Sequence, residues 1–488
     1  MVKFDLGYVW LLFVIIMLVW SSVTVKGEGV IKVNYKFYGL ERNLSALKAH
    51  DEMRHLQILA GIDLPIGGDG RLDSVGLYYT KIGIGTPPNN FTVQVDTGSD
   101  VMWVNCISCQ RCPRRGYGGM ELTRYNPKDS LTGKLILCGQ SFCKDVNRGS
   151  LPGCFGNSSC TYARHYGDGS YSTGFLVEDV VQYDLVSGDL QTEPANWSVI
   201  FGCGAQQYGN LISPDEAFDG ILGFGKSNSS ILSQLVSSGK VKNMFAHCLD
   251  SVNGGGIFAI GNVVQPEVNM TPMVPNQPHY SVNMMAVEVG HQFLNLSVDV
   301  FMNGESNGVI IDTGLTLAYL PEVIYSPLVR KILSWQPYLK LHHDEYTCFE
   351  YSGSVDDGFP QVTFHFQNSL SLRVRPREYL LPSDDLLCIG WQNSGNQSRD
   401  IWNHTVFGDF VLSNKLFLYD LENQAIGWTE YNCSSSVALK DEVTGSIRLV
   451  GAHSLSSGSR LTAQMAPTFF LLIPLLHNYI LNWYTSGA

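Results

Sequence analysis

Two copies of the tripeptide Asp-Thr-Gly hold the residues of this sequence that are best suited to catalysis. With the residue that follows each copy, they are Asp96-Thr97-Gly98-Ser99 and Asp312-Thr313-Gly314-Leu315. Two carboxyl groups held close together cannot easily both ionise, so one of them keeps a proton. The ionised group can then activate a water molecule while the protonated group polarises a carbonyl. Peptide hydrolysis by this route requires no metal, cofactor or covalent intermediate.

The residues around each carboxyl suit that role. Glycine lets the backbone turn tightly behind the aspartate, and the threonine hydroxyl can hydrogen-bond across a junction between two halves of the protein. A single Asp-Thr-Gly is an ordinary turn. Two of them, each placed between apolar strands, predict that Asp96 and Asp312 form one catalytic pair.

A third motif, Tyr166-Gly167-Asp168-Gly169-Ser170, carries two glycines around a polar residue. This pattern predicts the mobile tip of a hairpin, able to open for a peptide and to close over it. A plain surface hairpin is the alternative, and the aspartate pair favours the first reading.

The elements that must position these residues are short strands. Alternating apolar runs bounded by Gly, Pro and Asn dominate the chain from Leu77 onward. Residues 78–103, around the first Asp-Thr-Gly, and residues 280–320, around the second, contain the same order of elements. A second, shorter repeat relates residues 218–223 to residues 405–409. Such duplication predicts an all-β protein of two similar lobes that face each other across a cleft.

These motifs resemble those of the pepsin-type aspartic proteases, and most closely the plant members with a cysteine-rich insertion. The similarity covers about Tyr78 to Cys433. It implies the bilobal pepsin-like fold, with two pseudo-symmetric β lobes, and an aspartic endopeptidase that binds an extended polypeptide substrate. It also implies that the segment before the first lobe is an inhibitory pro-segment.

The resemblance assigns roles to individual residues. Asp96 and Asp312 are the dyad, Tyr166 and Gly167 form the flap tip, and the Trp103 indole N–H bonds that tyrosine. The other residues expected around the dyad are Thr97, Gly98, Ser99, Thr313 and Gly314.

Leu315 departs from the family pattern. Members generally carry Ser or Thr there, and its hydroxyl donates to the catalytic carboxylate; Ser99 fills this place in the first copy. Losing a hydrogen bond to the ionised form raises proton affinity, so we expect an asymmetric dyad with activity at higher pH or a lower rate. The alternative function is a catalytically weak or inactive protease-like protein that binds or inhibits. A glycosylated structural component of the surface is a third reading, which leaves the paired aspartates without a role.

Both ends of the chain resemble targeting signals. An apolar stretch from Tyr8 to Trp20 behind Lys3 predicts a signal peptide over residues 1–27. Near the other end, small residues, a polar spacer and an apolar tail predict a glycolipid (GPI) anchor signal with attachment at Ser457. A disordered tail or a single membrane span are the alternatives.

The chain between these signals divides into parts of different character. Residues 28–71 are richer in charge and include helical spacing, which we interpret as a removable pro-segment; an attached N-terminal helix is the alternative. Residues 72–265 are predicted as the N-terminal β lobe with the flap and the cysteine-rich insertion. Residues 266–435 are predicted as the C-terminal β lobe, and 436–488 as a linker and the anchor signal.

The 12 cysteines indicate an oxidising compartment. Seven crowd together and are predicted to form disulfides: Cys106, Cys109, Cys112, Cys138, Cys143, Cys154 and Cys160. Zinc is the weaker alternative because no paired histidines accompany them. Seven is odd, so one must pair outside the cluster, with Cys203 as a candidate. Cys348 with Cys388 is the pair expected in the second half.

Asn-x-Ser/Thr tripeptides also indicate the secretory route. They begin at Asn43, Asn90, Asn157, Asn196, Asn228, Asn269, Asn295, Asn396, Asn403 and Asn432. Together with the terminal signals, they predict a glycoprotein at the extracellular face of the plasma membrane. The net charge of −12 argues against nucleic acid as a partner. We expect a monomer that acts on polypeptides without cofactor or metal.

Overall fold

The structure is a computed structural model that describes residues 61–68, 77–147, 149, 154–297, 299–302, 308–343, 346–383, 385–396 and 404–455. These residues belong to one compact unit of the chain, Leu56–Ala488. The predicted signal peptide, most of the predicted pro-segment and Ser457 lie outside the described residues, so those assignments stay predictions. No helix within the described ranges is long and apolar enough to cross a membrane.

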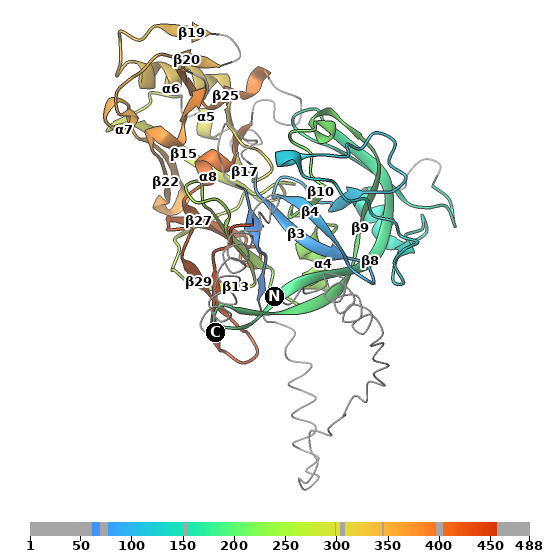
Figure 1. Cartoon of the computed structure of the whole chain (residues 1–488). Helices are drawn as coiled ribbons and strands as arrows, with labels where there is room; N and C mark the ends of the chain where they lie inside the picture. The colour runs from blue at the N-terminus through green and yellow to red at the C-terminus, as the bar shows by residue number, and fades with distance from the viewer. Residues whose placement is uncertain are drawn as a thin grey trace, which may run out of the picture. The chain divides into compact units, whose positions relative to one another are not determined.

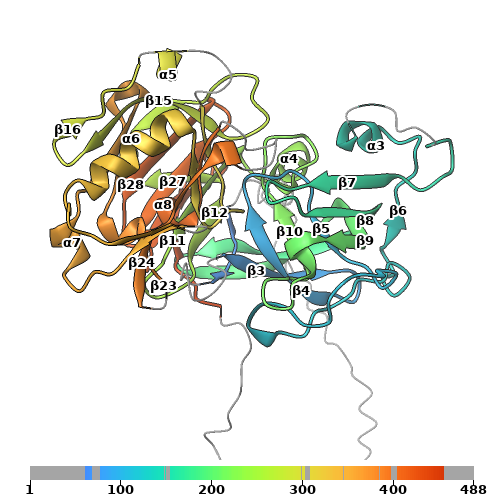
Figure 2. The same cartoon turned by 90° about the horizontal axis from the view of Figure 1, so that it is seen from above.

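Strands dominate, and the predicted all-β fold is confirmed. Figures 1 and 2 show blue-to-green strands gathered in one lobe and yellow-to-red strands in the other. The strands as far as the middle of the chain are β1 (Ile62–Asp63), β2 (Ile66–Gly67), β3 (Tyr79–Ile84), β4 (Asn89–Asp96), β5 (Trp103–Asn105), β6 (Lys134–Leu135), β7 (Thr161–His165), β8 (Tyr171–Gly188), β9 (Gln191–Tyr208), β10 (Gly220–Gly223), β11 (Met244–Leu249), β12 (Gly256–Ile260) and β13 (Asn262–Gln265).

The second half continues in the same manner. Its strands are β14 (Met270–Pro272), β15 (Ser281–Val289), β16 (Gln292–Phe293), β17 (Gly308–Ile311), β18 (Ala318–Leu320), β19 (Leu341–His343), β20 (Thr347–Phe349), β21 (Val362–Phe366), β22 (Ser371–Val374), β23 (Leu380–Ser383), β24 (Leu386–Ile389), β25 (Trp391–Asn393), β26 (Thr405–Phe407), β27 (Lys415–Asp420), β28 (Ala425–Glu430), β29 (Ser436–Lys440) and β30 (Ile447–Gly451).

Helices are few and short. The longest described helix packs Ile324, Leu328 and Ile332 inward at a spacing of four residues, which places them on one face. Within the described ranges the α-helices are α3 (Ser141–Val146), α4 (Ile231–Ser237), α5 (Asp299–Met302), α6 (Glu322–Leu333), α7 (Val355–Gly358) and α8 (Asp409–Leu412).

Each lobe holds its Asp-Thr-Gly turn on the same framework of strands. β4, which ends at Asp96, runs parallel to β10, and β10 is antiparallel to β5. β17, which ends just before Asp312, runs parallel to β26, and β26 is antiparallel to β18. The repeat in the sequence is therefore a structural repeat, and the two lobes are pseudo-symmetric.

The strands that lead to the aspartates are central ones. Every residue of β4 from Phe91 to Asp96 is buried, and so is every residue of β17. Val and Ile buried on both faces suit strands that have neighbours on both sides. Each aspartate is thus held on a rigid base rather than on a free loop.

β1 joins the two parts of the largest sheet. The order there is β14-β28-β27-β11-β12-β1-β8-β9-β5-β10-β4-β3-β2. Ile62 pairs with Ile260 of β12 on one side and with Leu185 of β8 on the other. The predicted pro-segment boundary at residue 71 therefore falls beyond residues that are built into the folded body. Burial of Ile62, together with Leu64 and Ile66 in the core, is the physical reason.

The segment predicted as a linker starts with a paired hairpin in the structure. β29 and β30 form an antiparallel hairpin, and β29 pairs with β13. Val437, Leu439 and Val450 of this hairpin are buried. Residues 436–451 are thus a folded element, because Val437, Leu439 and Val450 pack with Val263 of β13 in one apolar cluster.

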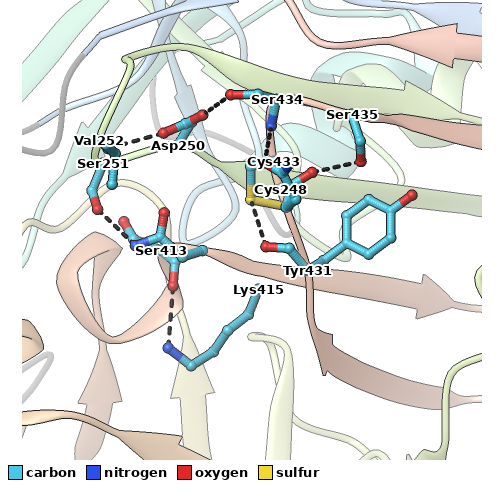
Figure 3. The surroundings of a disulfide bond; sticks show 12 residues. Cys248, Asp250, Ser251, Val252, Ser413, Lys415, Tyr431, Cys433, Ser434 and Ser435 are labelled. Carbon is cyan, nitrogen blue, oxygen red and sulfur yellow. Dashed lines mark hydrogen bonds between the residues drawn. A yellow bond between two sulfur atoms is a disulfide. The ribbon is translucent and has the colours of Figure 1, made fainter.

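Disulfides tie distant parts of the body together. The six pairs are Cys106–Cys203, Cys109–Cys112, Cys138–Cys154, Cys143–Cys160, Cys248–Cys433 and Cys348–Cys388. The structure thus contains the expected pair in the second half and the candidate pair to Cys203. Figure 3 shows the Cys248–Cys433 bond, which fixes β11 to the segment that leads into the β29–β30 hairpin.

Most predicted glycosylation sites can be located in the structure. The exposed asparagines among them are Asn90, Asn157, Asn196, Asn228, Asn269, Asn295 and Asn432. Asn43, Asn403 and the side chain of Asn396 lie outside the described residues. Exposure allows modification, and the use of these sites stays a prediction.

Candidate active site

The structure brings Asp96 and Asp312 together where the two lobes meet. The Asp96 side chain is buried, and Asp312 is partly exposed at the floor of a cleft. The two carboxyl groups are hydrogen-bonded to each other. The two turns that the sequence places far apart therefore form one site.

Thr97 and Thr313 lock the turns to each other. The N–H of Thr97 donates to Thr313 Oγ1 at 3.2 Å, and the N–H of Thr313 donates to Thr97 Oγ1 at 3.0 Å. Each hydroxyl then donates to the opposite strand, Thr97 to the Ile311 carbonyl at 3.0 Å and Thr313 to the Val95 carbonyl at 3.1 Å. Four buried hydrogen bonds fix the distance between the lobes at the dyad.

The two glycines are required by close approach. A Cβ atom on Gly98 would lie 2.2 Å from Asp312 Oδ2, and one on Gly314 would lie 2.4 Å from Asp96 Oδ1. Each turn therefore packs its glycine directly against the carboxylate of the other lobe, and any side chain there would push the dyad apart.

The hydrogen-bond donors around the two carboxyls differ. Asp96 Oδ1 accepts main-chain N–H groups of its own turn at 2.8 and 3.1 Å, and Asp96 Oδ2 accepts the Ser99 hydroxyl. Asp312 Oδ1 accepts the N–H of Gly314 at 2.8 Å. Leu315 stands where the second hydroxyl would be, and its side chain packs against Ile310 and Val406.

This difference separates the proton affinities of the pair. Burial raises the pKa of Asp96, and hydrogen bonds from Ser99 and Gly98 oppose the rise. Burial raises the pKa of Asp312 well above its usual range, and the neighbouring charge of Asp96 raises it further. The pair titrates as a unit, and its geometry favours the charge on Asp96 and the proton on Asp312.

The third motif is the tip of a hairpin over the dyad. β7 and β8 pair up to His165 and Tyr171, and the loop between them closes with the Tyr166 N–H on the Ser170 carbonyl at 2.9 Å. Gly169 takes a φ of 84°, which favours glycine. The His165 ring lies against that of Tyr171 in a tilted arrangement, with ring centroids 5.3 Å apart.

Trp103 supports the hairpin tip from below. Its indole N–H donates to the Tyr166 hydroxyl at 2.6 Å, as the resemblance implies. Trp103 is buried, whereas Tyr166 and Gly167 line the cleft. Burial raises the pKa of Tyr166, so its hydroxyl keeps its own proton while it accepts this bond.

A cleft of about 1350 Å³ lies between the lobes and contains both aspartates. The flap forms part of its wall. Apolar lining residues include Tyr117 and Phe218 at one side and Ile310, Leu315 and Val406 at another. Its volume suits an extended peptide of several residues.

Asp409 is a residue of the site that the sequence does not assign. It is 1% exposed, and neither of its carboxyl oxygens has a hydrogen-bond partner among the described residues. Its N–H donates to the Leu315 carbonyl at 2.8 Å, and the Phe407 carbonyl just before it accepts the N–H of Asp312 at 3.0 Å. Burial and then the charge of Asp312 raise the pKa of Asp409 well above its usual range. The repeated motif at residues 405–409 was the available signal.

Three cysteine sulfurs of the insertion lie close enough to suggest a metal site. Those of Cys138, Cys143 and Cys154 are all within 4.8 Å of one another. Each belongs to a disulfide, and sulfur in a disulfide is not the thiolate that binds zinc.

Comparison with protein families matches both lobes. Residues 78–262 match the family model described as xylanase inhibitor N-terminal, and residues 279–430 match the one described as xylanase inhibitor C-terminal. Together these matches cover more than half of the chain.

Curated relatives match over almost the full length. The chain is 44% identical to aspartic proteinase 36 of Arabidopsis thaliana over 93% of its own length and 95% of the relative. It is 46% identical to aspartic proteinase 39 of the same plant, over 88% of its own length and 90% of the relative.

Solved structures show the same fold at low sequence identity. Soybean basic 7S globulin matches with a TM-score of 0.58 and 19% identity, over 76% of this chain and 96% of the globulin. Lupine conglutin gamma matches with a TM-score of 0.60 and 18% identity, over 77% of this chain and 96% of the conglutin.

Proposed function

Because the chain belongs to the plant pepsin-like aspartic protease family, we propose that it is an aspartic endopeptidase that hydrolyses polypeptides. The observation that carries the proposal is the pair of cross-locked turns, which holds two hydrogen-bonded carboxyls at the floor of a cleft. The relatives named aspartic proteinases support the same activity.

The reaction follows from the different environments of the two carboxyls. Ionised Asp96 takes a proton from a water molecule, and the water oxygen attacks the carbonyl carbon of the scissile bond. Asp312 gives its proton to the carbonyl oxygen, which forms a neutral tetrahedral diol. Asp96 then passes its proton to the amide nitrogen, the C–N bond breaks, and a hydroxyl proton of the diol returns to Asp312. The dyad ends as it began, and no covalent intermediate forms.

The flap supplies a second part of the catalysis. With Tyr166 held by Trp103, the hairpin tip covers the dyad and displaces bulk water from a bound peptide. In the drier site, the charges of the carboxyls act on the substrate with less screening.

A peptide library incubated with the processed protein across acidic to neutral pH tests the proposal. Cleavage by the parent protein is expected, with losses of at least about a thousandfold in both Asp96→Asn and Asp312→Asn. Equal cleavage by parent and variants would rule out the dyad as the catalytic pair.

A protein that binds without cutting is the second candidate function. The matched family models are described as xylanase inhibitor domains, and Leu315 removes a donor from the dyad. The same library separates the two functions. A protein that only binds gives no cleavage products, and its binding of peptides or proteins stays intact in Asp96→Asn.

We further propose that the protein is a secreted, glycosylated zymogen anchored at the extracellular face of the plasma membrane. The sequence signals at both ends and the exposed tripeptide asparagines support this location. Release of the protein from cells by a phosphatidylinositol-specific phospholipase, and loss of that release in Ser457→Phe, are the expected results. Unchanged release in the variant places the anchor elsewhere.

A further inference from the structure

The first and the last described segments of the chain meet beside β1. After β30 the chain continues through residues 452–455, which run along the segment that contains β1 and β2. His453 exchanges main-chain hydrogen bonds with Gly256 of β12 at 2.8 and 2.7 Å. Leu455 forms a parallel bridge with Gly67, and its N–H donates to the Ile66 carbonyl at 3.2 Å. The carboxyl-terminal segment is therefore attached to the amino-terminal strands by main-chain bonds.

Side chains reinforce the same junction. His453 Nε2 lies 2.8 Å from Asp63 Oδ2 of β1, and the Tyr79 hydroxyl donates to the Leu455 carbonyl at 2.8 Å. Asp63 is 4% exposed, and its Oδ1 has no hydrogen-bond partner among the described residues. Because a buried carboxylate without partners is costly, His453 is the main compensation for Asp63.

Residues 452–455 are held in place independently of β1. They follow the β29–β30 hairpin, which pairs with β13, and the Cys248–Cys433 disulfide anchors the start of that hairpin to β11 (Figure 3). Near this bond, the Asp250 carboxylate accepts the Ser434 hydroxyl. The segment can therefore hold β1 in place rather than being held by it.

The junction also reaches the cleft. Leu455 packs against a cluster formed by Tyr79, Tyr117 and Phe218, in which the Tyr79 and Phe218 ring centroids are 5.4 Å apart. Tyr117 and Phe218 line the cleft. Loss of the segment would therefore loosen both a sheet strand and one wall of the cleft.

We propose that residues 452–455 form a clasp that retains residues 61–68 in the sheet, so that the mature body extends at least from Gly61 to Leu455. Any removable leading segment then ends before Gly61, and any carboxyl-terminal processing occurs after Leu455. The proposal concerns the frame of the protein and holds whether or not the protein cuts peptides.

The charged groups at the junction make the clasp pH-dependent. Asp63 comes from β1, Asp184 comes from the paired position of β8, and β12 contributes only Ala259 and Ile260 there. The hydrogen bond that His453 donates to the Asp63 carboxylate raises the pKa of His453, and burial raises the pKa of Asp184. A raised pKa stabilises the folded state at low pH and loses this effect as pH rises, for both groups. The clasp is therefore tighter at pH 5, where His453 carries a proton opposite the Asp63 carboxylate, than at pH 8.

A protein that is cut between residues 68 and 77 tests the clasp. A site for a sequence-specific protease replaces residues 70–75 of the processed full chain, and native mass spectrometry follows the severed amino-terminal fragment after cutting at pH 5. We expect the fragment to remain bound in the parent and to leave at least about tenfold faster in His453→Gln. Release should also speed up more between pH 5 and pH 8 in the parent and in the control than in His453→Gln. His291→Gln, at an exposed histidine of the other lobe, is the matched control.

Two results overturn the proposal. One is immediate loss of the fragment from the parent protein at pH 5, and the other is equal release from the His453 and His291 variants. Sequencing of the amino terminus of the purified mature protein is a second test that needs no variant. A stable mature chain that begins within residues 62–77 contradicts the clasp.

Discussion

At the scale of single residues, Leu315 distinguishes the two halves of the dyad. In Leu315→Thr, a hydroxyl can donate to ionised Asp312, which should lower the proton affinity of the pair. One hydrogen bond to a charged group corresponds to about one pH unit, so the high-pH limb of kcat/KM should move down by about that amount. The measurement is the pH–rate profile of the variant beside the parent.

Leu131→Thr is the control for this prediction, because Leu131 is 88% exposed and is not among the residues that line the cleft. A profile of Leu315→Thr that superimposes on those of the parent and the control contradicts the assigned asymmetry.

Asp409 is expected to govern stability rather than chemistry. Its folded pKa is raised by burial, so its contribution to stability is complete below about pH 4 and is lost as pH rises. One such group increases the unfolding constant about tenfold per pH unit. In Asp409→Asn, the slope of the free energy of unfolding against pH should correspond to one proton fewer released on unfolding. Chemical denaturation between pH 4 and pH 7 measures this slope.

Asp250 contributes to stability with the opposite pH dependence, and Asp250→Asn is the comparison variant. Burial acts to raise the pKa of Asp250, but the hydrogen bonds from Ser434 and Asn253 outweigh it, so the pKa is lowered. Asp250→Asn should therefore lower the free energy of unfolding at neutral pH. The decrease in that free energy between pH 4 and pH 7 should not become smaller. Equal slopes in the parent and Asp409→Asn would show that Asp409 does not hold a proton in the folded protein.

The sequence predicts the dyad and its asymmetry because both depend on local motifs. Asp96, Asp312 and the missing hydroxyl at Leu315 can be read from one repeat and its one difference. Asp409 could not be assigned in this way. Its burial beneath the dyad depends on the parallel pairing of β26 with β17, which joins segments distant in the chain.

At the scale of elements, the flap depends on the bond between Trp103 and Tyr166. Trp103→Phe keeps an aromatic ring in the core but removes the donor at 2.6 Å. A buried hydrogen bond is worth about 1 kcal/mol, so kcat/KM should fall roughly five- to tenfold while the melting temperature changes little. Trp335→Phe, at a half-exposed tryptophan of the other lobe, should leave both quantities unchanged. Equal kcat/KM for Trp103→Phe and the parent would separate the flap from catalysis.

Short strands near the ends were the elements that the sequence did not predict. β1 and β2 contain two residues each, which is too little for an alternating pattern to stand out from a charged leading segment. Their places depend on β8, β12 and residues 452–455, all of which are distant in the chain. The flap hairpin was predictable because its glycines and its strands are adjacent in sequence.

At the scale of the whole molecule, the duplicated pattern was sufficient to predict two β lobes with a cleft. Symmetry of the pairs β4–β10 and β17–β26 explains this success, since each lobe repeats the same local order. The ends of the body were less predictable. They are set by contacts that close the chain on itself, such as the bond between His453 and Asp63.

The pH dependence of kcat/KM on one defined peptide, measured for the parent and Asp96→Asn, tests the central claim most directly. Two carboxyls that share one proton predict a bell-shaped profile with two limbs, and a loss of at least about a thousandfold in the variant at the optimum. A parent profile without two limbs, or a variant that retains more than a tenth of the activity, would contradict the account.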